Sequence, residues 1–176
     1  EPKTPDEIFH NIETELDGIQ KAAGAQYNTV HLTPKESNKG GRFDIALLQG
    51  YQANRADKPK PRFLHLARDM MHKKLGAFMH MDCEADDGMS SAQWTAVRSG
   101  QTDLSVIATK DKDLRMVPGL HLEWGSWDLN TSTGFGSLQW EKEKLRGYGT
   151  IFFWFQMLAG DDVDNIGGIP LLYAPV

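Results

Sequence analysis

Apolar residues near the start of the chain recur with the spacing of one helix face. This stretch opens with Thr4 as an N-cap, Pro5 at the first helical position and Glu7 as the partner in a capping box, and it closes at Gly24. Its spaced apolar positions are Ile8, Ile12, Leu16 and Ile19. We therefore predict an amphipathic helix that begins at Pro5 and ends at Gly24.

The rest of the chain alternates short apolar runs, typical of buried strands, with helical patterns. The predicted strands are "QYNTVHLT" at 26–33, "AFMHMD" at 77–82, "LSVIAT" at 104–109 and "LHLEWG" at 120–125. The predicted helices are "PRFLHLARDMMHKKLG" at 61–76 and "EADDGMSSAQWTAVRSG" at 84–100, the second with Ala85, Met89, Ala92 and Ala96 facing inward. Residues 34–42 read as a loop, and residues 44–55 as a short helix or an ordered arch. This order predicts an α/β fold with a mostly parallel central sheet flanked by helices.

Composition supports a single domain with a real core. The chain has 176 residues, of which 40% are hydrophobic. The large residues expected in the core are Met70, Met71, Met79, Met81, Trp94, Trp154 and the "IFFWF" run at 151–155. Stacking of some of these aromatic rings on nucleic-acid bases is the alternative.

Cysteine content and hydropathy bear on the compartment. The single cysteine, Cys83, excludes an internal disulfide and fits a reducing environment. No apolar run approaches the roughly 20 residues that span a bilayer, and the first residues lack an apolar signal region. We expect a cytoplasmic protein without a membrane partner, in the host cell cytoplasm if it comes from a phage.

The net charge of -5 argues against a polyanionic partner unless the acids are clustered around cations. Two bound divalent cations would add four charges, and -5 + 4 leaves -1. Basic residues are clustered as well. The segment 54–62 carries Arg55, Lys58, Lys60 and Arg62 against one acid, Asp57.

Acidic residues gather in three segments that each follow an apolar run. The members are Glu84, Asp86 and Asp87 after the strand at 77–82, Asp111 and Asp113 after the strand at 104–109, and Asp161 and Asp164 after the run at 151–159. The last two are spaced to share the face of one helical turn. Since ligands gather at the carboxyl ends of parallel strands, we expect the segments to meet in one crevice.

Each acidic segment also has an ordinary explanation. Acids are favoured in the first turn of a helix, as at 84–87. Asp111 and Asp113 alternate with lysines as in a solvated turn, and residues 161–165 suit a turn or a cap. Like charges that converge, however, repel one another unless a cation or a proton intervenes. Convergence of all three segments would favour hard divalent cations with oxygen ligands, Mg²⁺ or Mn²⁺.

Other catalytic signatures are absent from the sequence. The six histidines are dispersed without HExxH spacing, and there is no Cys/His set for zinc. The sequence contains neither a GxSxG elbow nor a GxxxxGK[ST] loop. A Ca²⁺-stabilised structural domain is a further hypothesis, although the sequence has no DxDxDG loop to support it.

The acidic segments, in this order and at about this spacing, resemble the motifs of a known family. "EADD" at 84–87, "ATKDKDLRMVPG" at 108–119 and "GDDVDNIGGIP" at 160–170 look like the three acidic motifs of the 5′ nucleases, the flap endonuclease and 5′-to-3′ exonuclease superfamily with a PIN-like fold. "YQANRADKPKP" at 51–61 resembles the family's segment that leads into a helical arch. The resemblance covers about residues 27 to 170 and is closest in character to bacteriophage exonucleases.

This resemblance implies a nuclease that hydrolyses phosphodiester bonds in DNA during replication or repair, using two Mg²⁺ or Mn²⁺ ions. It assigns Glu84, Asp86 and Asp87 to a first metal site, and Asp111, Asp113, Asp161 and Asp164 to a second site or its water-bridged shell. The implied DNA-binding residues are Tyr51, Gln52, Arg55, Lys58, Lys60 and Arg62, with Arg55 as the catalytic cation. The last motif would begin a helix-turn-helix that grips duplex DNA and a K⁺ ion. The implied partners are DNA with 5′ ends, flaps or junctions and a replication polymerase.

The chain departs from the family pattern in four places. It begins at the helix expected to follow an Asp-bearing opening strand, and it stops before the second DNA-gripping helix. Thr33 stands where a second Asp is expected, with Glu36 as the only nearby substitute, and Gln52 replaces the arch lysine. We expect residues 1–176 to be a single catalytic domain that lacks the N-terminal strand and the C-terminal part of the full protein. An active 5′ nuclease and a catalytically weak DNA-binding remnant both remain open.

Overall fold

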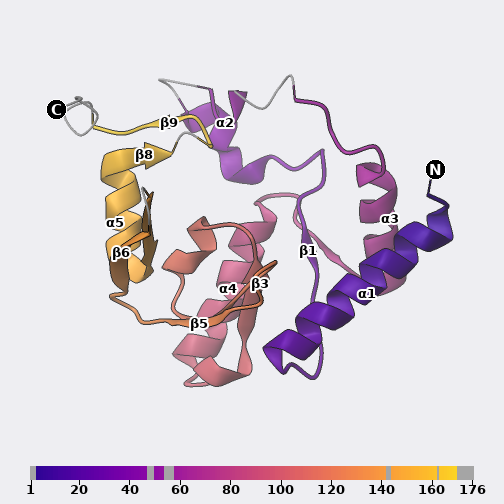
Figure 1. The fold of residues 1–176 in the computed structure, drawn as a ribbon. Coiled ribbons are helices and arrows are strands. Elements are labelled where there is room, and N and C mark those ends of the chain that lie inside the picture. The colour runs from indigo at the N-terminus through magenta and orange to yellow at the C-terminus, as the bar shows by residue number, and fades with distance from the viewer. Residues whose placement is uncertain (1–2, 47–49, 54–57, 142–143, 162, 170–176) are drawn as a thin grey trace.

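The computed structural model describes residues 3–46, 50–53, 58–141, 144–161 and 163–169, and it has a mixed α/β architecture (Figure 1). Its five α-helices are α1 (Pro5–Ala23), α2 (Arg42–Ile45), α3 (Leu64–Leu75), α4 (Ala85–Arg98) and α5 (Gly149–Ala159). The strands are β1 (His31–Leu32), β2 (Phe78–Met79), β3 (Val106–Thr109), β4 (Gly119–Glu123), β5 (Leu129–Ser132), β6 (Ser137–Glu141), β7 (Lys144–Tyr148), β8 (Gly160–Asp161) and β9 (Ile166–Gly167). Figure 1 places α5 on the opposite side of the molecule from α1 and α3.

Helix α1 forms where its local signals place it. The Thr4 hydroxyl accepts a hydrogen bond from the Glu7 amide, and the Glu7 carboxylate accepts one from the Thr4 amide at 2.7 Å. The helix ends at Gly24, whose φ of 64° lies in the left-handed region that glycine adopts without strain. Ile8 and Ile19 are buried on its inner face. The prediction for this segment is confirmed.

The strands pair partly as predicted. β1 pairs with β2 and β3 pairs with β4, both in parallel, and β5 adds to β4 in antiparallel. β6 with β7 and β8 with β9 form antiparallel pairs of their own. The mixed α/β class is confirmed, but the single mostly parallel sheet is wrong for the described part of the chain, which forms four small sheets. The reason is twofold. β1 and β2 are only two residues long, and β5, β6 and β7, for which the sequence predicts no element, pair in antiparallel and need no helical crossover.

The β3–β4 pair lies between two helices, because α4 contacts β3 from one side and α1 contacts both strands. Ile107, Leu114 and Val117 form the buried cluster here, with Met89 of α4 packed against it. Burial in this cluster is what holds the turn after β3 against α4.

The inward face of α4 differs in part from the predicted one: Met89 packs against the core as predicted. Ala92 is exposed, whereas its neighbour Gln93 is only 1% exposed. Gln93 Nε2 donates to the Leu120 carbonyl of β4 at 3.1 Å. Gly119, at a φ of 118°, provides the space, since a Cβ there would collide with the Gln93 amide. A glycine in the facing strand thus decides which side of α4 is buried.

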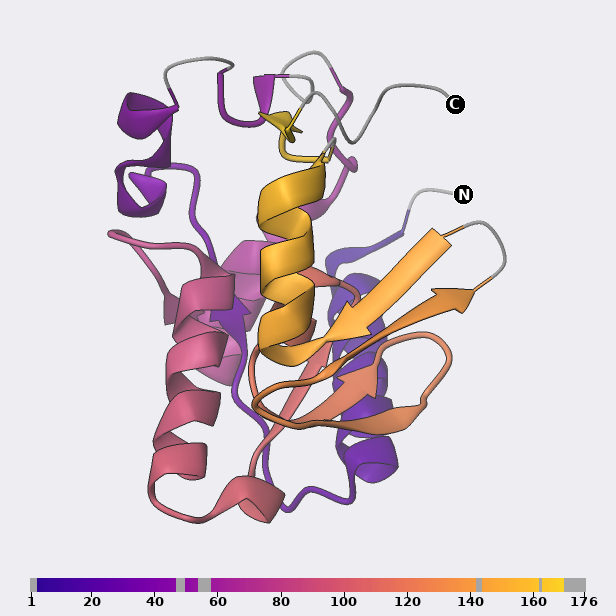
Figure 2. The same cartoon turned by 90° about the vertical axis from the view of Figure 1, so that its left-hand side faces the viewer.

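Several large residues predicted for the core are on the surface. Trp94, Trp154 and Met81 are exposed, while Met70 and Phe152 are buried. Helix α5 packs one face against β6, β7 and the 3₁₀ turn at Asp113–Met116 (Figure 2), so its other faces stay open. Among the described residues, no helix combines the length and the apolar character needed to cross a membrane.

The segment after α5 turns back as the β8–β9 pair rather than continuing as a helical turn. Asp161 pairs with Ile166, and Asn165 takes a left-handed φ of 61° between them. The predicted helical turn over 161–164 is therefore wrong, because Gly160 at a φ of 81° redirects the chain into a strand. Figure 1 shows this hairpin and α2 at the same end of the molecule.

Candidate functional site

The first acidic segment forms the start of α4, and its three acids divide between two neighbourhoods. Glu84 is the N-cap residue, and Asp87 at the third helical position accepts the Glu84 amide at 2.9 Å. The helix-start explanation therefore holds for Asp87. Arg42 also donates to both carboxylate oxygens of Asp87, at 2.9 Å and 3.0 Å. Burial would raise the Asp87 pKa, but the contact with Arg42 and the hydrogen bond from the Glu84 amide together outweigh it, and the pKa is lowered.

Glu84 is surrounded by donors from the segment before α3. The Tyr51 hydroxyl donates to Glu84 Oε2 at 2.9 Å, Lys39 Nζ lies 3.5 Å from Oε1, and Arg42 lies 3.6 Å from Oε2. Burial and the neighbouring Glu84 carboxylate raise the pKa of Tyr51, so its phenol stays a hydrogen-bond donor at neutral pH. Glu84 and Asp87 are thus held mainly by cations and a phenol.

Asp86 is within reach of the charges of the second acidic segment. Its pKa is raised to about 6 by burial and then by the charges of Asp111, Glu84, Asp87 and Asp113. Neighbouring residues in the first turn of a helix point in directions about 100° apart, which is why Asp86 and Asp87 meet different partners.

The second segment is held in a tight turn at the end of β3. Thr109 Oγ1 accepts the Asp111 amide, and Asp111 Oδ1 accepts the Asp113 amide, both at 3.0 Å. Asp113 begins a 3₁₀ turn, so this segment is a turn and does not continue β3. Gln156 of α5 donates to Asp113 Oδ1 at 2.7 Å. Burial nevertheless raises the Asp113 pKa, with the Asp111 and Asp161 charges contributing in the same direction.

The third segment completes the group. Asp113, Asp161 and Asp164 each have a carboxylate oxygen within 4.8 Å of the others. Lys112 Nζ lies 3.0 Å from Asp161 Oδ2, and Gln52 Nε2 donates to Asp164 Oδ1 at 3.2 Å. The structure therefore brings the second and third acidic segments together, and hydrogen bonds from Gln52 to Asp164 and to Tyr51, and from Tyr51 to Glu84, link them to the first. We call Asp86, Asp111, Asp113, Asp161 and Asp164 the carboxylate cluster.

The residues assigned to DNA binding fall into three sets. Tyr51 and Gln52 lie at the cluster and are joined by a 3.1 Å hydrogen bond from Gln52 Nε2 to the Tyr51 hydroxyl. Lys58, Lys60 and Arg62 are exposed. Arg55, assigned as the catalytic cation, lies outside the described residues, so its position stays a prediction.

The residue standing where a further Asp was expected has a different role. Thr33 Oγ1 accepts the Ala85 amide at 2.8 Å, so it caps the first turn of α4 from outside the helix. Glu36 is exposed on the adjoining loop. Neither side chain adds a carboxylate to the cluster.

Four residues that contact the acids or their partners carry no signal of that role in the sequence: Lys39, Arg42, Lys112 and Gln156. The first two lie in a segment read only as a loop, and Lys112 counted only as part of a charged turn. The "KGGR" sequence, with two glycines between cations, was the one signal in the chain that pointed to a specially shaped loop.

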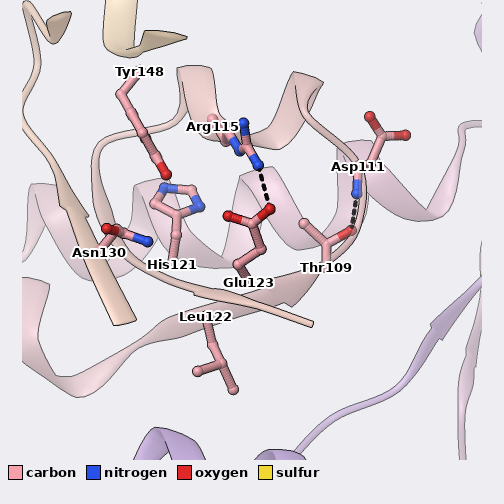
Figure 3. A pocket seen from close by; sticks show the side chains of 8 residues that line it. All are labelled: Thr109, Asp111, Arg115, His121, Leu122, Glu123, Asn130 and Tyr148. Carbon is pink, nitrogen blue, oxygen red and sulfur yellow. Dashed lines mark hydrogen bonds and ion pairs between the residues drawn. The ribbon is translucent and has the colours of Figure 1, made fainter. Parts of the chain in front are cut away.

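A small hollow lies beside the second segment. It is lined by residues of β3, β4 and β5 together with Asp111, Arg115 and Tyr148, and its volume of about 10 Å³ leaves room for one water at most (Figure 3). Its main feature is the Arg115–Glu123 ion pair at 2.8 Å, which ties the 3₁₀ turn to β4. The Asp111 carboxylate lies apart from that pair in Figure 3.

Comparisons of the chain with family models, with curated proteins and with solved structures found no match.

Proposed function

We propose that this protein is a metal-dependent 5′ nuclease that hydrolyses phosphodiester bonds in DNA at 5′ ends, flaps or junctions. The observation that carries the proposal is the carboxylate cluster, in which Asp113, Asp161 and Asp164 from two separate segments meet and Asp86 of a third is within reach of their charges. The raised pKa values of Asp86 and Asp113 support it, because burial and then the neighbouring carboxylates disfavour ionisation of these two acids.

The donor set suits hard divalent cations. The cluster offers carboxylate oxygens, which are the ligands that Mg²⁺ and Mn²⁺ prefer. Asp113, Asp161 and Asp164 would hold one ion, and Asp86 with Asp111 would hold a second beside it. When bound, such ions supply activation of a water for in-line attack and neutralise charge on the departing oxygen.

The surrounding residues perform the remaining tasks. Arg42 neutralises Asp87 and Tyr51 orients Glu84, which fixes the first turn of α4 and hence the direction of Asp86. Gln156 orients Asp113 from α5. The exposed Lys58, Lys60 and Arg62 would contact the phosphate backbone, which would give recognition of DNA shape rather than sequence.

The PIN-like fold is part of the proposal. It is supported by the parallel β1–β2 and β3–β4 pairs, in which β2 and β3 are each followed along the chain by an acidic segment. A helix-turn-helix with its K⁺ ion would have to start after residue 169, since the described part of the third motif forms β8 and β9.

A catalytically weak DNA-binding remnant is the second candidate, favoured by two observations. Lys112 Nζ lies 3.0 Å from Asp161 Oδ2, and Thr33 stands where a further Asp was expected. An ammonium in contact with the cluster competes with a metal ion for the same carboxylate.

A cleavage assay distinguishes the active nuclease from the remnant. A 5′-labelled flap duplex is incubated with the wild type in Mg²⁺, with the wild type in EDTA, and with the Asp113→Ala variant in Mg²⁺. If the protein is an active nuclease, the wild type should form cleavage product with Mg²⁺. No product should form with EDTA or with the Asp113→Ala variant. Asp103→Ala, which removes an exposed acid outside the cluster, should leave cleavage unchanged. Flap binding by the wild type without any Mg²⁺-dependent product would instead identify the remnant.

A further inference from the structure

We infer that Lys39 is the active-site cation that binds the scissile phosphate, an inference that rests on the proposed nuclease function. Lys39 Nζ donates to Gln52 Oε1 at 2.8 Å and lies 3.5 Å from Glu84 Oε1. Gln52 in turn donates to Asp164. The ammonium therefore sits between the first and the third acidic segments, with its side chain 22% exposed.

The loop that carries Lys39 is shaped for this placement. Lys39 has a φ of 51°, and Gly40 and Gly41 both have a φ of 70°. A lysine in the left-handed region costs about 1 kcal/mol, so neighbouring contacts must hold it there.

Those contacts come from the segment that leads into α4. Buried Ser37 donates to the Cys83 carbonyl at 2.9 Å and accepts the Lys39 amide at 3.2 Å. The Asn38 amide donates to the Met81 carbonyl at 2.9 Å. The backbone of Lys39 is thus fixed relative to Glu84 and the first turn of α4.

The neighbouring cation, Arg42, is already bound to Asp87. Arg42 uses both terminal nitrogens on Asp87, and this hydrogen bonding raises its pKa further above the usual range. Lys39, by contrast, donates one short hydrogen bond, to Gln52, and forms a longer ion pair with Glu84 at 3.5 Å, so its three-donor ammonium keeps a donor for a third group. The rings of Phe43 and Tyr51 lie 5.3 Å and 5.9 Å from Nζ, within the range of a cation–π contact.

A phosphodiester that approaches the carboxylate cluster needs cationic contacts to offset repulsion from the acids. Lys39 Nζ would donate to a non-bridging oxygen of the scissile phosphate and would stabilise the charge that grows there during attack. When DNA is absent, Lys39 Nζ would stay hydrogen-bonded to Gln52 Oε1, as in this structure. An ammonium on residue 52 would occupy nearly the same place, because the Gln52 side-chain oxygen already touches Nζ.

The test compares Lys39→Gln with the exchanged pair Lys39→Gln/Gln52→Lys, and with Lys35→Gln as a control on an exposed lysine of the same loop. Single-turnover cleavage of a 5′ flap with Mg²⁺ should fall on the order of 100-fold in Lys39→Gln and recover at least tenfold in the exchanged pair. Lys35→Gln should stay close to the wild type.

A second readout uses no metal. Flap binding in EDTA, measured over a range of salt, should lose about one unit of salt slope in Lys39→Gln and regain it in the exchanged pair. If the wild type cleaves but Lys39→Gln matches it, the Lys39 role is overturned and the nuclease stands. If the wild type does not cleave, the nuclease fails, and an unchanged salt slope would overturn the phosphate contact separately. Loss of activity in Lys39→Gln without recovery in the exchanged pair would show a structural role and would also overturn it.

Discussion

Replacing Asp86 by asparagine should stabilise the metal-free protein at neutral and higher pH. The folded-state pKa of Asp86 is about 6, above its ordinary 3.8, because burial and the Asp111, Glu84, Asp87 and Asp113 charges disfavour its ionised form. Folding therefore favours the protonated form. The contribution of Asp86 to stability is present below about pH 4 and is lost as the pH rises through about 6.

The size of the effect follows from the pKa. A rise from 3.8 to about 6 corresponds to about 3 kcal/mol. Asp86 is partly exposed, so solvent screening reduces this to about 1.5 kcal/mol. For a chain of this length, that free energy raises the melting temperature by about 3–6 °C.

Thermal unfolding of the wild type and Asp86→Asn in EDTA, at pH 5 and pH 8, measures the effect. The variant should melt above the wild type at pH 8, and the difference should shrink at pH 5. Adding Mg²⁺ at pH 8 should stabilise the wild type more than the variant, since the variant lacks one ligand. Asp103→Asn, at an exposed site, is the matched control.

Two results would refute this reasoning. An Asp86→Asn protein that melts below the wild type at pH 8 in EDTA would mean that the ionised carboxylate is well compensated in the folded chain. Equal stabilisation of both proteins by Mg²⁺ would mean that Asp86 holds no ion.

Three further perturbations probe the neighbourhood of the site. Gly88→Ala should destabilise the protein by about 1–3 kcal/mol in urea unfolding, because a Cβ there would collide with the His80 ring; an unchanged midpoint would show that the ring moves freely. Lys112→Met should tighten Mg²⁺ binding about two- to fivefold in a calorimetric titration, since it frees Asp161 from a competing ammonium, and weaker binding would contradict this. Thr4→Ala should lower the free energy of unfolding by about 1 kcal/mol through loss of the N-cap, whereas flap cleavage should stay at the wild-type rate.

Short-range signals in the sequence were sufficient for most of the helices. α1 and α3 form where periodicity and their terminal glycines place them, because caps and helical spacing act within a few residues. The same is true of the strand at 106–109 and of the turn after it. The burial of a side chain could not be predicted from its own segment where it depends on a contact with a residue distant in the sequence. The burial of Gln93 depends on Gly119, and the exposure of Trp154 depends on the single face that α5 packs.

The sequence by itself determined which residues are acidic, their order, and that each acidic segment follows an apolar run, so it predicted that the segments meet. Only the tertiary structure decided how the acids divide. Asp87 turns to Arg42 and Asp86 turns to Asp111, although they are neighbours in the chain. The arrival of Lys39 at this site, 45 positions before Glu84, was likewise decided by the folded loop. The physical reason is that charge–charge contacts and burial depend on distances in space, and the chain sets those distances only when its elements have packed together.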